Sequence, residues 1–225
     1  MGLVRKTLGT ALAVVAGGVG YLTATTNLTT QLSADDELLA SKSFKKFNRY
    51  HNPPMQDVCW KRIPVSEIRP ELRDNEEALT IEFCRGAWAG YAYAPQRTIL
   101  SLTNKGPKTA DQLFDQQQLA SSNYELGTRF SDHFEVVERT RNSVMFRGGG
   151  SPLEPGPRDV DGLFVISAKL DKSAGTVDVG LKAAFFNSVE PTGKKPAPFF
   201  VELLHQYYAR AMVDDAARRL TRKGP

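Results

Sequence analysis

The chain has few of the residues from which metal and redox sites are built. Its 225 residues include only two cysteines, Cys59 and Cys84, and three histidines. Two cysteines cannot form a disulfide framework or a zinc site by themselves, and neither a CxxC nor an HExxH motif is present. We therefore expect no metal and no cofactor. Cys84 lies in an apolar stretch and is predicted to be a core thiol, while a Cys59–Cys84 bridge would require an oxidising compartment.

Acidic residues are missing from the first 34 positions, and an uncharged run, Leu8–Leu22, follows Arg5 and Lys6. This run is short for a spanning helix, which needs roughly 20 apolar residues. A membrane tether, a cleaved signal peptide and a mitochondrial presequence remain as alternatives, in that order. We expect residues 1–34 to be an apolar anchor or targeting segment with a linker, and residues 8–25 to contact a membrane in the secretory pathway or the mitochondrion.

The chain also lacks a strong excess of positive charge. Of its 29 basic residues, Arg5 and Lys6 precede Asp35, which leaves 27 basic and 25 acidic residues in the remainder. Because binding to phosphate backbones needs a clustered basic face, this near-neutral balance argues against a nucleic-acid partner.

The C-terminal third carries the clearest pattern of secondary structure. Apolar residues alternate with polar ones from Gly127 onward, which indicates strands, and a long amphipathic segment ends the chain. The predicted elements are strands at Ser143–Arg147, Asp161–Leu170 and Thr176–Asn187, a hairpin turn at Asp171–Gly175 and a helix at Pro198–Arg222. This order predicts an α+β helix-grip domain over residues 35–225, in which an antiparallel sheet wraps around the C-terminal helix and leaves an apolar pocket.

Two further segments bear on that pocket. Apolar residues between Leu79 and Leu102 follow a helical spacing, and Pro95 is expected to kink or split the helix. The segment Gly148–Arg158 is rich in glycine and proline and cannot be a central strand. It is predicted to be a flexible hairpin loop, with a lid over the pocket as the functional alternative.

Asp132 is the first candidate for acid–base chemistry. If Phe130 and Phe134 face the core, strand alternation directs Asp132 inward as well and His133 outward. A buried carboxylate must be paired or take up a proton, and either state suits a general acid or base. The structural alternative is that Asp132 caps a loop or pairs with an arginine such as Arg158. A one-residue bulge would exchange Asp132 and His133.

His205 is the second catalytic candidate. The last helix is predicted to bury a stripe that consists of Phe200, Leu204, Tyr207, Tyr208, Ala211 and Asp215. His205 shares a flank with Val201 and Met212 and so borders this stripe. A boundary histidine with satisfied hydrogen bonds is the structural alternative to a catalytic role.

Several residues are predicted to bind a ligand in the pocket. They are inward-facing aromatic residues of the strands, phenols of the last helix and one arginine that could hold an anionic or carbonyl oxygen. The set is Phe134, Phe164, Phe185, Tyr207, Tyr208 and Arg158.

Four segments together resemble a known family. They are KRIPVSEIRPEL (Lys61–Leu72), SDHFEVVE (Ser131–Glu138), GPRDVDGLFVISA (Gly156–Ala168) and ELLHQYYAR (Glu202–Arg210). The strand pair with its closing helix resembles the START-like polyketide cyclase/dehydrase superfamily, also called SRPBCC. The segments are most similar to a fungal family encoded beside polyketide synthases, one branch of which is associated with α-pyrone formation.

This resemblance implies two functions of different classes. The first is an auxiliary cyclase of secondary-metabolite biosynthesis that closes a polyketide chain to an α-pyrone, with a polyketide intermediate as ligand and a polyketide synthase as partner. The second is a non-catalytic carrier of a lipid, quinone or other hydrophobic ligand, tethered at a membrane. The resemblance supplies no catalytic residues, and fold alone does not decide between the two.

Overall fold

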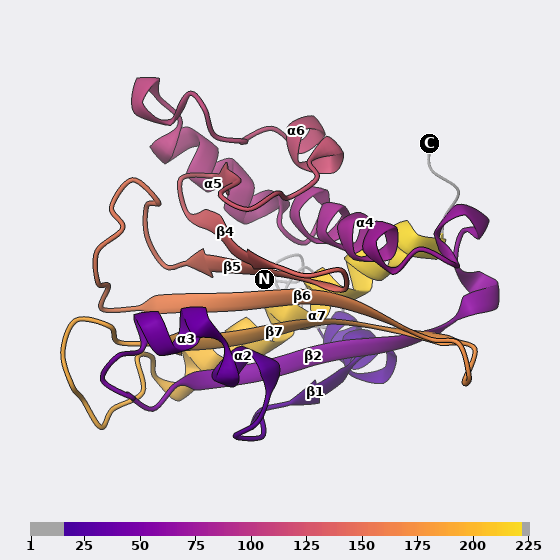
Figure 1. Ribbon diagram of the computed structural model, residues 1–225, viewed down its shortest axis with the longest axis horizontal. Coiled ribbons are helices and arrows are strands. Elements are labelled where there is room, and N and C mark those ends of the chain that lie inside the picture. The colour runs from indigo at the N-terminus through magenta and orange to yellow at the C-terminus, as the bar shows by residue number, and fades with distance from the viewer. Residues whose placement is uncertain (1–15, 222–225) are drawn as a thin grey trace, which may run out of the picture.

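The computed structural model describes residues 16–221 and shows an α+β fold (Figure 1). Seven strands in this range form one antiparallel sheet in the order β1-β2-β7-β6-β5-β4-β3. The strands are β1 (Asn27–Thr29), β2 (Met55–Pro64), β3 (Arg129–Phe130), β4 (Phe134–Arg139), β5 (Ser143–Gly148), β6 (Asp161–Asp171) and β7 (Thr176–Phe186). The C-terminal helix, α7 (Phe199–Thr221), packs against this sheet, as the sequence predicts.

The hairpin of β6 and β7 is the longest pairing in the sheet. Its register runs without a break from Asp161↔Phe186 to Asp171↔Thr176. Asp171 closes the turn because its Oδ1 accepts hydrogen bonds from the backbone N–H groups of Ser173 and Ala174. Gly175 completes the turn at φ +64°, a conformation that glycine adopts without strain. The predicted strands and turn are therefore confirmed.

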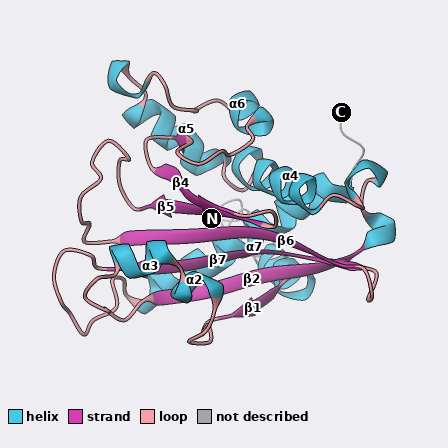
Figure 2. Cartoon of the chain, in the orientation of Figure 1, coloured by secondary structure: helices cyan, strands magenta, loops and turns pink. Residues whose placement is uncertain are grey.

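Helices lie on both faces of the sheet (Figure 2). They are α2 (Glu37–Ala40), α3 (Lys42–Phe47), α4 (Glu76–Ala89), α5 (Ala94–Asn104), α6 (Gln116–Ser121) and α7, with 3₁₀ turns η1 (Val65–Glu67), η2 (Pro70–Leu72) and η3 (Pro107–Thr109). The predicted helix at 79–102 is split into α4 and α5, and Pro95 lies in the first turn of α5, where its missing N–H leaves no bond unmade.

The two faces of the sheet bury cores of different size. The larger core lies between the sheet and helices α4 and α7 and includes Phe83, Trp88 and Phe146. The smaller core lies under α2 and α3, where Leu38 joins Leu163 and Phe186. In Figure 1, α2 and α3 lie in front of the sheet and α7 lies behind it.

Helix α7 is held against α4 by an unusually close approach. A Cβ atom on Gly86 would lie 2.7 Å from the Cα atom of Ala216, so only glycine fits there without a shift of the backbone. Asp215 adds a hydrogen bond, because its Oδ2 accepts from the N–H of Ala92 at 3.0 Å. Together these contacts fix the C-terminal half of α7.

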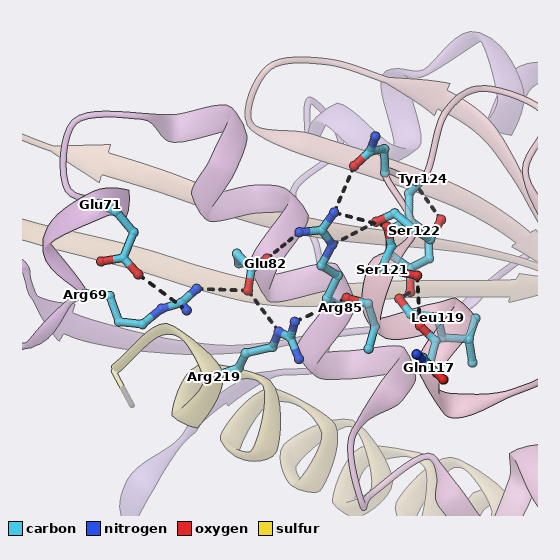
Figure 3. A network of polar contacts seen from close by, with 12 residues as sticks. Arg69, Glu71, Glu82, Arg85, Gln117, Leu119, Ser121, Ser122, Tyr124 and Arg219 are labelled. Carbon is cyan, nitrogen blue, oxygen red and sulfur yellow. Dashed lines mark hydrogen bonds and ion pairs between the residues drawn. The ribbon is translucent and has the colours of Figure 1, made fainter. Parts of the chain in front are cut away.

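Glu82 of α4 ties the same region together electrostatically (Figure 3). Its carboxylate is 2.5 Å from Arg85 and 2.9 Å from both Arg69 and Arg219. Burial opposes ionisation of Glu82, but the hydrogen bonds and charges of Arg85 and Arg219 outweigh it and lower the pKa of this carboxyl. One acid thus links α4, α7 and the segment before η2.

The buried stripe of α7 differs from the predicted one. The buried residues all lie from position 206 onward and include three alanines; they are Gln206, Ala209, Met212, Val213, Asp214, Ala216, Ala217 and Leu220. Phe200 and Leu204, predicted to be buried, are 69% and 70% exposed. The prediction followed large apolar side chains, whereas the face of α7 that meets α4 at Gly86 carries Ala216.

The N-terminal part of the described chain also packs on α7. Residues 16–25 are helical, and Arg210 of α7 donates a 2.7 Å hydrogen bond to the carbonyl of Thr26. The first part of the predicted anchor, residues 1–15, lies outside the described residues. Within residues 16–221 no helix combines the length and apolar character needed to cross a membrane.

The Glu82 cluster makes a testable contribution to stability. Glu82→Gln is expected to lower the free energy of unfolding by roughly 1.5–3 kcal/mol near neutral pH, the range for hydrogen bonds to charged groups. Because the pKa of Glu82 is lowered in the folded chain, its stabilisation is complete above the ordinary pKa of a glutamate. It is lost as pH falls through the lowered value. The destabilisation should therefore shrink in acid.

Urea unfolding of both proteins at neutral and acidic pH measures this effect. Glu77→Gln is a matched control on the same helix, because the Glu77 side chain is 55% exposed and, within residues 16–221, forms an ion pair with Arg139 alone. Its effect should stay within about 0.5 kcal/mol. Equal effects of the two substitutions would contradict the assigned role of Glu82.

Candidate functional site

A cavity of about 700 Å³ lies between the sheet and the N-terminal half of α7. Side chains of α4, α5, α7, β6 and β7 line it, together with the residues at the start of β4. Most of its wall is apolar, and Trp88, Leu181 and Met212 contribute to it. A concave, largely apolar space with few polar groups is the usual form of a small-molecule site.

The cavity exists because α7 is packed tightly only along its C-terminal half. Toward its N-terminus, Val201 and Leu204 line the cavity instead of filling the core. Helix α5 covers the opposite side, although none of its residues is buried. Ile99 and Leu204 line the space while remaining 62% and 70% exposed, so they mark its mouth.

The structure brings together most of the predicted ligand-binding residues. Phe134, Phe164, Phe185 and Tyr208 all line the cavity. The rings of Phe134 and Phe164 are 5.7 Å apart, and those of Phe164 and Phe185 are 5.1 Å apart, each pair packed edge to face. These three phenylalanines form a continuous aromatic floor on the sheet.

Arg158 and Tyr207 lie elsewhere. Arg158 donates 2.9 Å hydrogen bonds to the carbonyls of Gly148 and Ser151. It therefore holds the 148–158 loop together rather than reaching into the cavity. Tyr207 is half-buried on α7 but does not line the cavity, whose wall at this level is Tyr208.

Asp132 and His133 have exchanged the orientations that strand alternation predicts. Ser131 and Asp132 both have left-handed backbone conformations, with φ of +55° and +47°, in a turn between β3 and β4. This turn breaks the alternation, so His133 lines the cavity. The inward orientation expected for Asp132 is thus wrong, and the bulge alternative describes the chain better. The carboxylate of Asp132 instead accepts hydrogen bonds from Ser151 at 2.6 Å and Gln112 at 3.0 Å.

The surroundings of His133 favour the neutral form of its imidazole. Burial lowers its pKa, and the nearby charge of Arg158 lowers it further against the opposing effect of Asp132. Its Nε2 accepts a 3.3 Å hydrogen bond from the N–H of Gly149. The ring packs edge-on against Phe134 at 4.7 Å. His133 therefore places a polar group at the edge of the aromatic floor.

His205 lines the cavity from the opposite wall, on α7. As predicted, it shares this flank with Val201 and Met212. Its ring packs edge-on against Phe185 at 4.8 Å. Its Nε2 is 3.4 Å from Oδ2 of Asp57, a residue of β2 whose side chain is 1% exposed. Asp57 was not among the predicted site residues, because its importance depends on the contact between β2 and α7.

Tyr208 supplies another polar group in the cavity wall. Its hydroxyl donates to Oε1 of Gln96 at 2.8 Å across the gap between α7 and α5. Burial raises the pKa of this phenol, so it remains a neutral donor and acceptor near neutral pH.

The cysteines do not contribute a nucleophile. Cys59 and Cys84 are both buried and unpaired. Burial raises the pKa of Cys59 to about 11 and that of Cys84 well above its ordinary value, so both are core thiols. Within the described residues, no cluster of three or more histidine, cysteine, aspartate or glutamate side chains could hold a metal ion.

Searches of protein-family models, curated proteins and solved structures find no match to this chain. The cavity and the groups that line it are therefore the basis on which a function can be assigned.

Occupation of the cavity can be tested with its own tryptophan. The chain has two tryptophans, of which Trp88 lines the cavity and Trp60 lies on the opposite face of the sheet. Trp60→Phe leaves Trp88 as the only tryptophan. Titration of this variant with an alkyl hydroxy-pyrone is expected to change its fluorescence saturably, because the ligand displaces water beside the indole.

Trp88→Phe, which retains Trp60, provides the matched control and should show no saturable change. A response of equal size in the two variants would indicate that the probe does not bind in the cavity.

Proposed function

We propose that this protein is a START-like helix-grip protein that binds a hydrophobic polyketide chain in the cavity and promotes its lactonisation to an α-pyrone. This activity would make it an auxiliary cyclase of fungal secondary-metabolite biosynthesis, acting on the product of a polyketide synthase. The observation that carries the proposal is the placement of His205 and His133 in a largely apolar cavity, at the two ends of the row formed by Phe134, Phe164 and Phe185.

The reaction requires one proton transfer and one acyl transfer. A base removes a proton from the carbon between two ketones of a β,δ-diketo thioester, which gives an enolate. The δ-oxygen then attacks the thioester carbonyl, a C–O bond forms, the C–S bond breaks, and the thiolate leaves with the proton. Subsequent enolisation of the ring gives the hydroxy-pyrone.

An apolar cavity assists this reaction in two ways. It folds a flexible chain so that the δ-oxygen lies beside the acyl carbonyl, and aligned intramolecular reactions reach effective molarities of roughly 10⁵–10⁸ M. It also keeps water from hydrolysing the thioester. The aromatic floor of Phe134, Phe164 and Phe185 suits a conjugated, planar product.

His205 is the proposed base, since it faces the cavity and has a carboxylate behind it. Asp132, the other predicted catalytic residue, is assigned a supporting role. Its bond to Ser151 ties the turn before β4 to the 148–158 loop. It therefore acts on the position of His133 rather than on the ligand.

A carrier function is the second candidate, and a different observation favours it. Phe199, Phe200 and Leu204 at the start of α7 are 69–75% exposed beside the cavity mouth. Such a rim suits the loading of a lipid or quinone from a membrane that residues 8–25 are expected to contact.

Turnover of a β,δ-diketo thioester separates the two functions. His205→Gln retains polarity and size but removes the base, so pyrone formation above the spontaneous rate should fall roughly 10²–10⁴-fold. The melting temperature and the Trp88 fluorescence titration should change little. Asp132→Asn should lower the rate less, because Asp132 does not face the ligand.

If the parent protein gives no acceleration over the spontaneous reaction, or if His205→Gln is as fast as the parent, the cyclase function is contradicted. The carrier function then remains, supported by retained binding of the hydrophobic probe.

A further inference from the structure

Asp57 is a buried carboxylate without a hydrogen-bond partner among the described residues. Its side chain is 1% exposed, and neither of its oxygens accepts a hydrogen bond. In the sheet it lies opposite Ala183, between the cavity-lining positions Leu181 and Phe185 of β7. Burial of an unpaired carboxylate is costly, so its presence calls for an explanation.

Other unsatisfied polar atoms belong to residues of the same cavity wall. Six side-chain nitrogen and oxygen atoms in residues 16–221 are buried without a partner, and four of them belong to Asp57, His205 and Trp88. His205 and Trp88 line the cavity, and Asp57 lies directly behind His205. Native proteins satisfy nearly all such atoms, and exceptions concentrate at functional sites.

Other buried aspartates of this protein are fully paired. Asp161 accepts from Arg147 at 2.6 Å and from Ser188 at 2.8 Å. Asp214 accepts from Lys61 at 2.8 Å and from Arg218 at 2.7 Å. Asp161 and Asp214 therefore have basic partners, as expected for buried carboxylates that stabilise the fold. Asp57 has no such partner among the described residues.

The residue that could pair with Asp57 is His205, whose Nε2 lies 3.4 Å from Oδ2 of Asp57. This distance is too long for a good hydrogen bond, but catalytic hydrogen bonds are often long without substrate and tighten in the reactive complex. Phe185 packs against the His205 ring at 4.8 Å and limits its orientation.

We propose that Asp57 is a positioning residue that makes His205 a base through Nδ1. The carboxylate directs the proton of the neutral imidazole to Nε2, which leaves the lone pair of Nδ1 for a ligand in the cavity. When Nδ1 takes the proton of the diketone, the negative charge of Asp57 stabilises the imidazolium. The imidazolium then returns that proton to the departing thiolate. This inference rests on the proposed cyclase function.

The experiment uses the full chain with Asp57→Leu and Asp57→Asn, and Asp214→Asn as a matched buried control outside the cavity. Asp57→Leu removes both the charge and the acceptor, whereas Asp57→Asn keeps a carbonyl acceptor without charge. We expect Asp57→Leu to lose roughly 10²-fold or more of pyrone turnover, and Asp57→Asn to lose less. Trp88 fluorescence binding of the alkyl hydroxy-pyrone should persist in both.

Two readouts separate positioning from mere structural support. In ¹⁵N NMR of histidine-labelled protein, the His205 ring should show the Nε2–H tautomer in the parent and a mixture of tautomers in Asp57→Leu. His205→Gln identifies its signals among the three histidines. The melting temperature of Asp57→Leu should equal or exceed that of the parent, because a buried unpaired charge is removed. Asp214→Asn should melt lower, because it leaves Lys61 and Arg218 without their partner.

An unchanged tautomer in Asp57→Leu, or a turnover equal to the parent's, would overturn the proposal. So would a fall in both melting temperature and probe binding, which would make Asp57 structural. If the parent itself forms no pyrone, the cyclase function fails, but the tautomer and melting measurements still decide whether Asp57 orients His205.

Discussion

The close contact between α4 and α7 at Gly86 determines where the C-terminal helix lies, and the cavity depends on that position. Because no Cβ fits between Gly86 and the backbone of Ala216, the two helices meet at their backbones. Glu82 then links three arginines around the contact. With its C-terminal half fixed in this way, the N-terminal half of α7 lies over the sheet and leaves the cavity between its own side chains and the aromatic floor.

Several polar side chains line the unfilled space, although a closely packed core would exclude them. His205 and Tyr208 enter from α7, and His133 enters from the turn before β4. Asp57 lies behind His205, on strand β2 of the sheet. These three segments are far apart in the chain, so the tertiary fold alone brings them together. A protein that needed only a stable core would gain by replacing them with apolar residues.

Much of the fold could be predicted from the sequence because its signals are local. The alternation in β6 and β7 and the Asp171–Gly175 turn need no tertiary information, and neither does the length of α7. The shared flank of His205, Val201 and Met212 followed from helical spacing, although the stripe predicted to be buried is not the buried one. Aromatic residues on inward strand positions similarly led to Phe134, Phe164 and Phe185.

The predictions were wrong or incomplete where the backbone departs from regular strand geometry, or where a residue's role depends on a tertiary contact. Two consecutive left-handed residues, Ser131 and Asp132, interrupt the alternation and turn His133 inward. Large side chains at Phe200 and Leu204 suggested a buried stripe, although tight helix contact favours alanine. Asp57 could not be linked to His205 because its significance depends on a contact between β2 and α7.

The central claim is that the cavity under the N-terminal half of α7 is the ligand site. Methyl NMR of the isotope-labelled protein tests it most directly, with an alkyl hydroxy-pyrone as ligand. The account predicts saturable shifts for Leu181, Val201 and Met212, which line the cavity, and none for Leu163 and Val165 in the core under α2 and α3. Shifts confined to Leu163 and Val165, or no saturable shift at the cavity methyls, would contradict it.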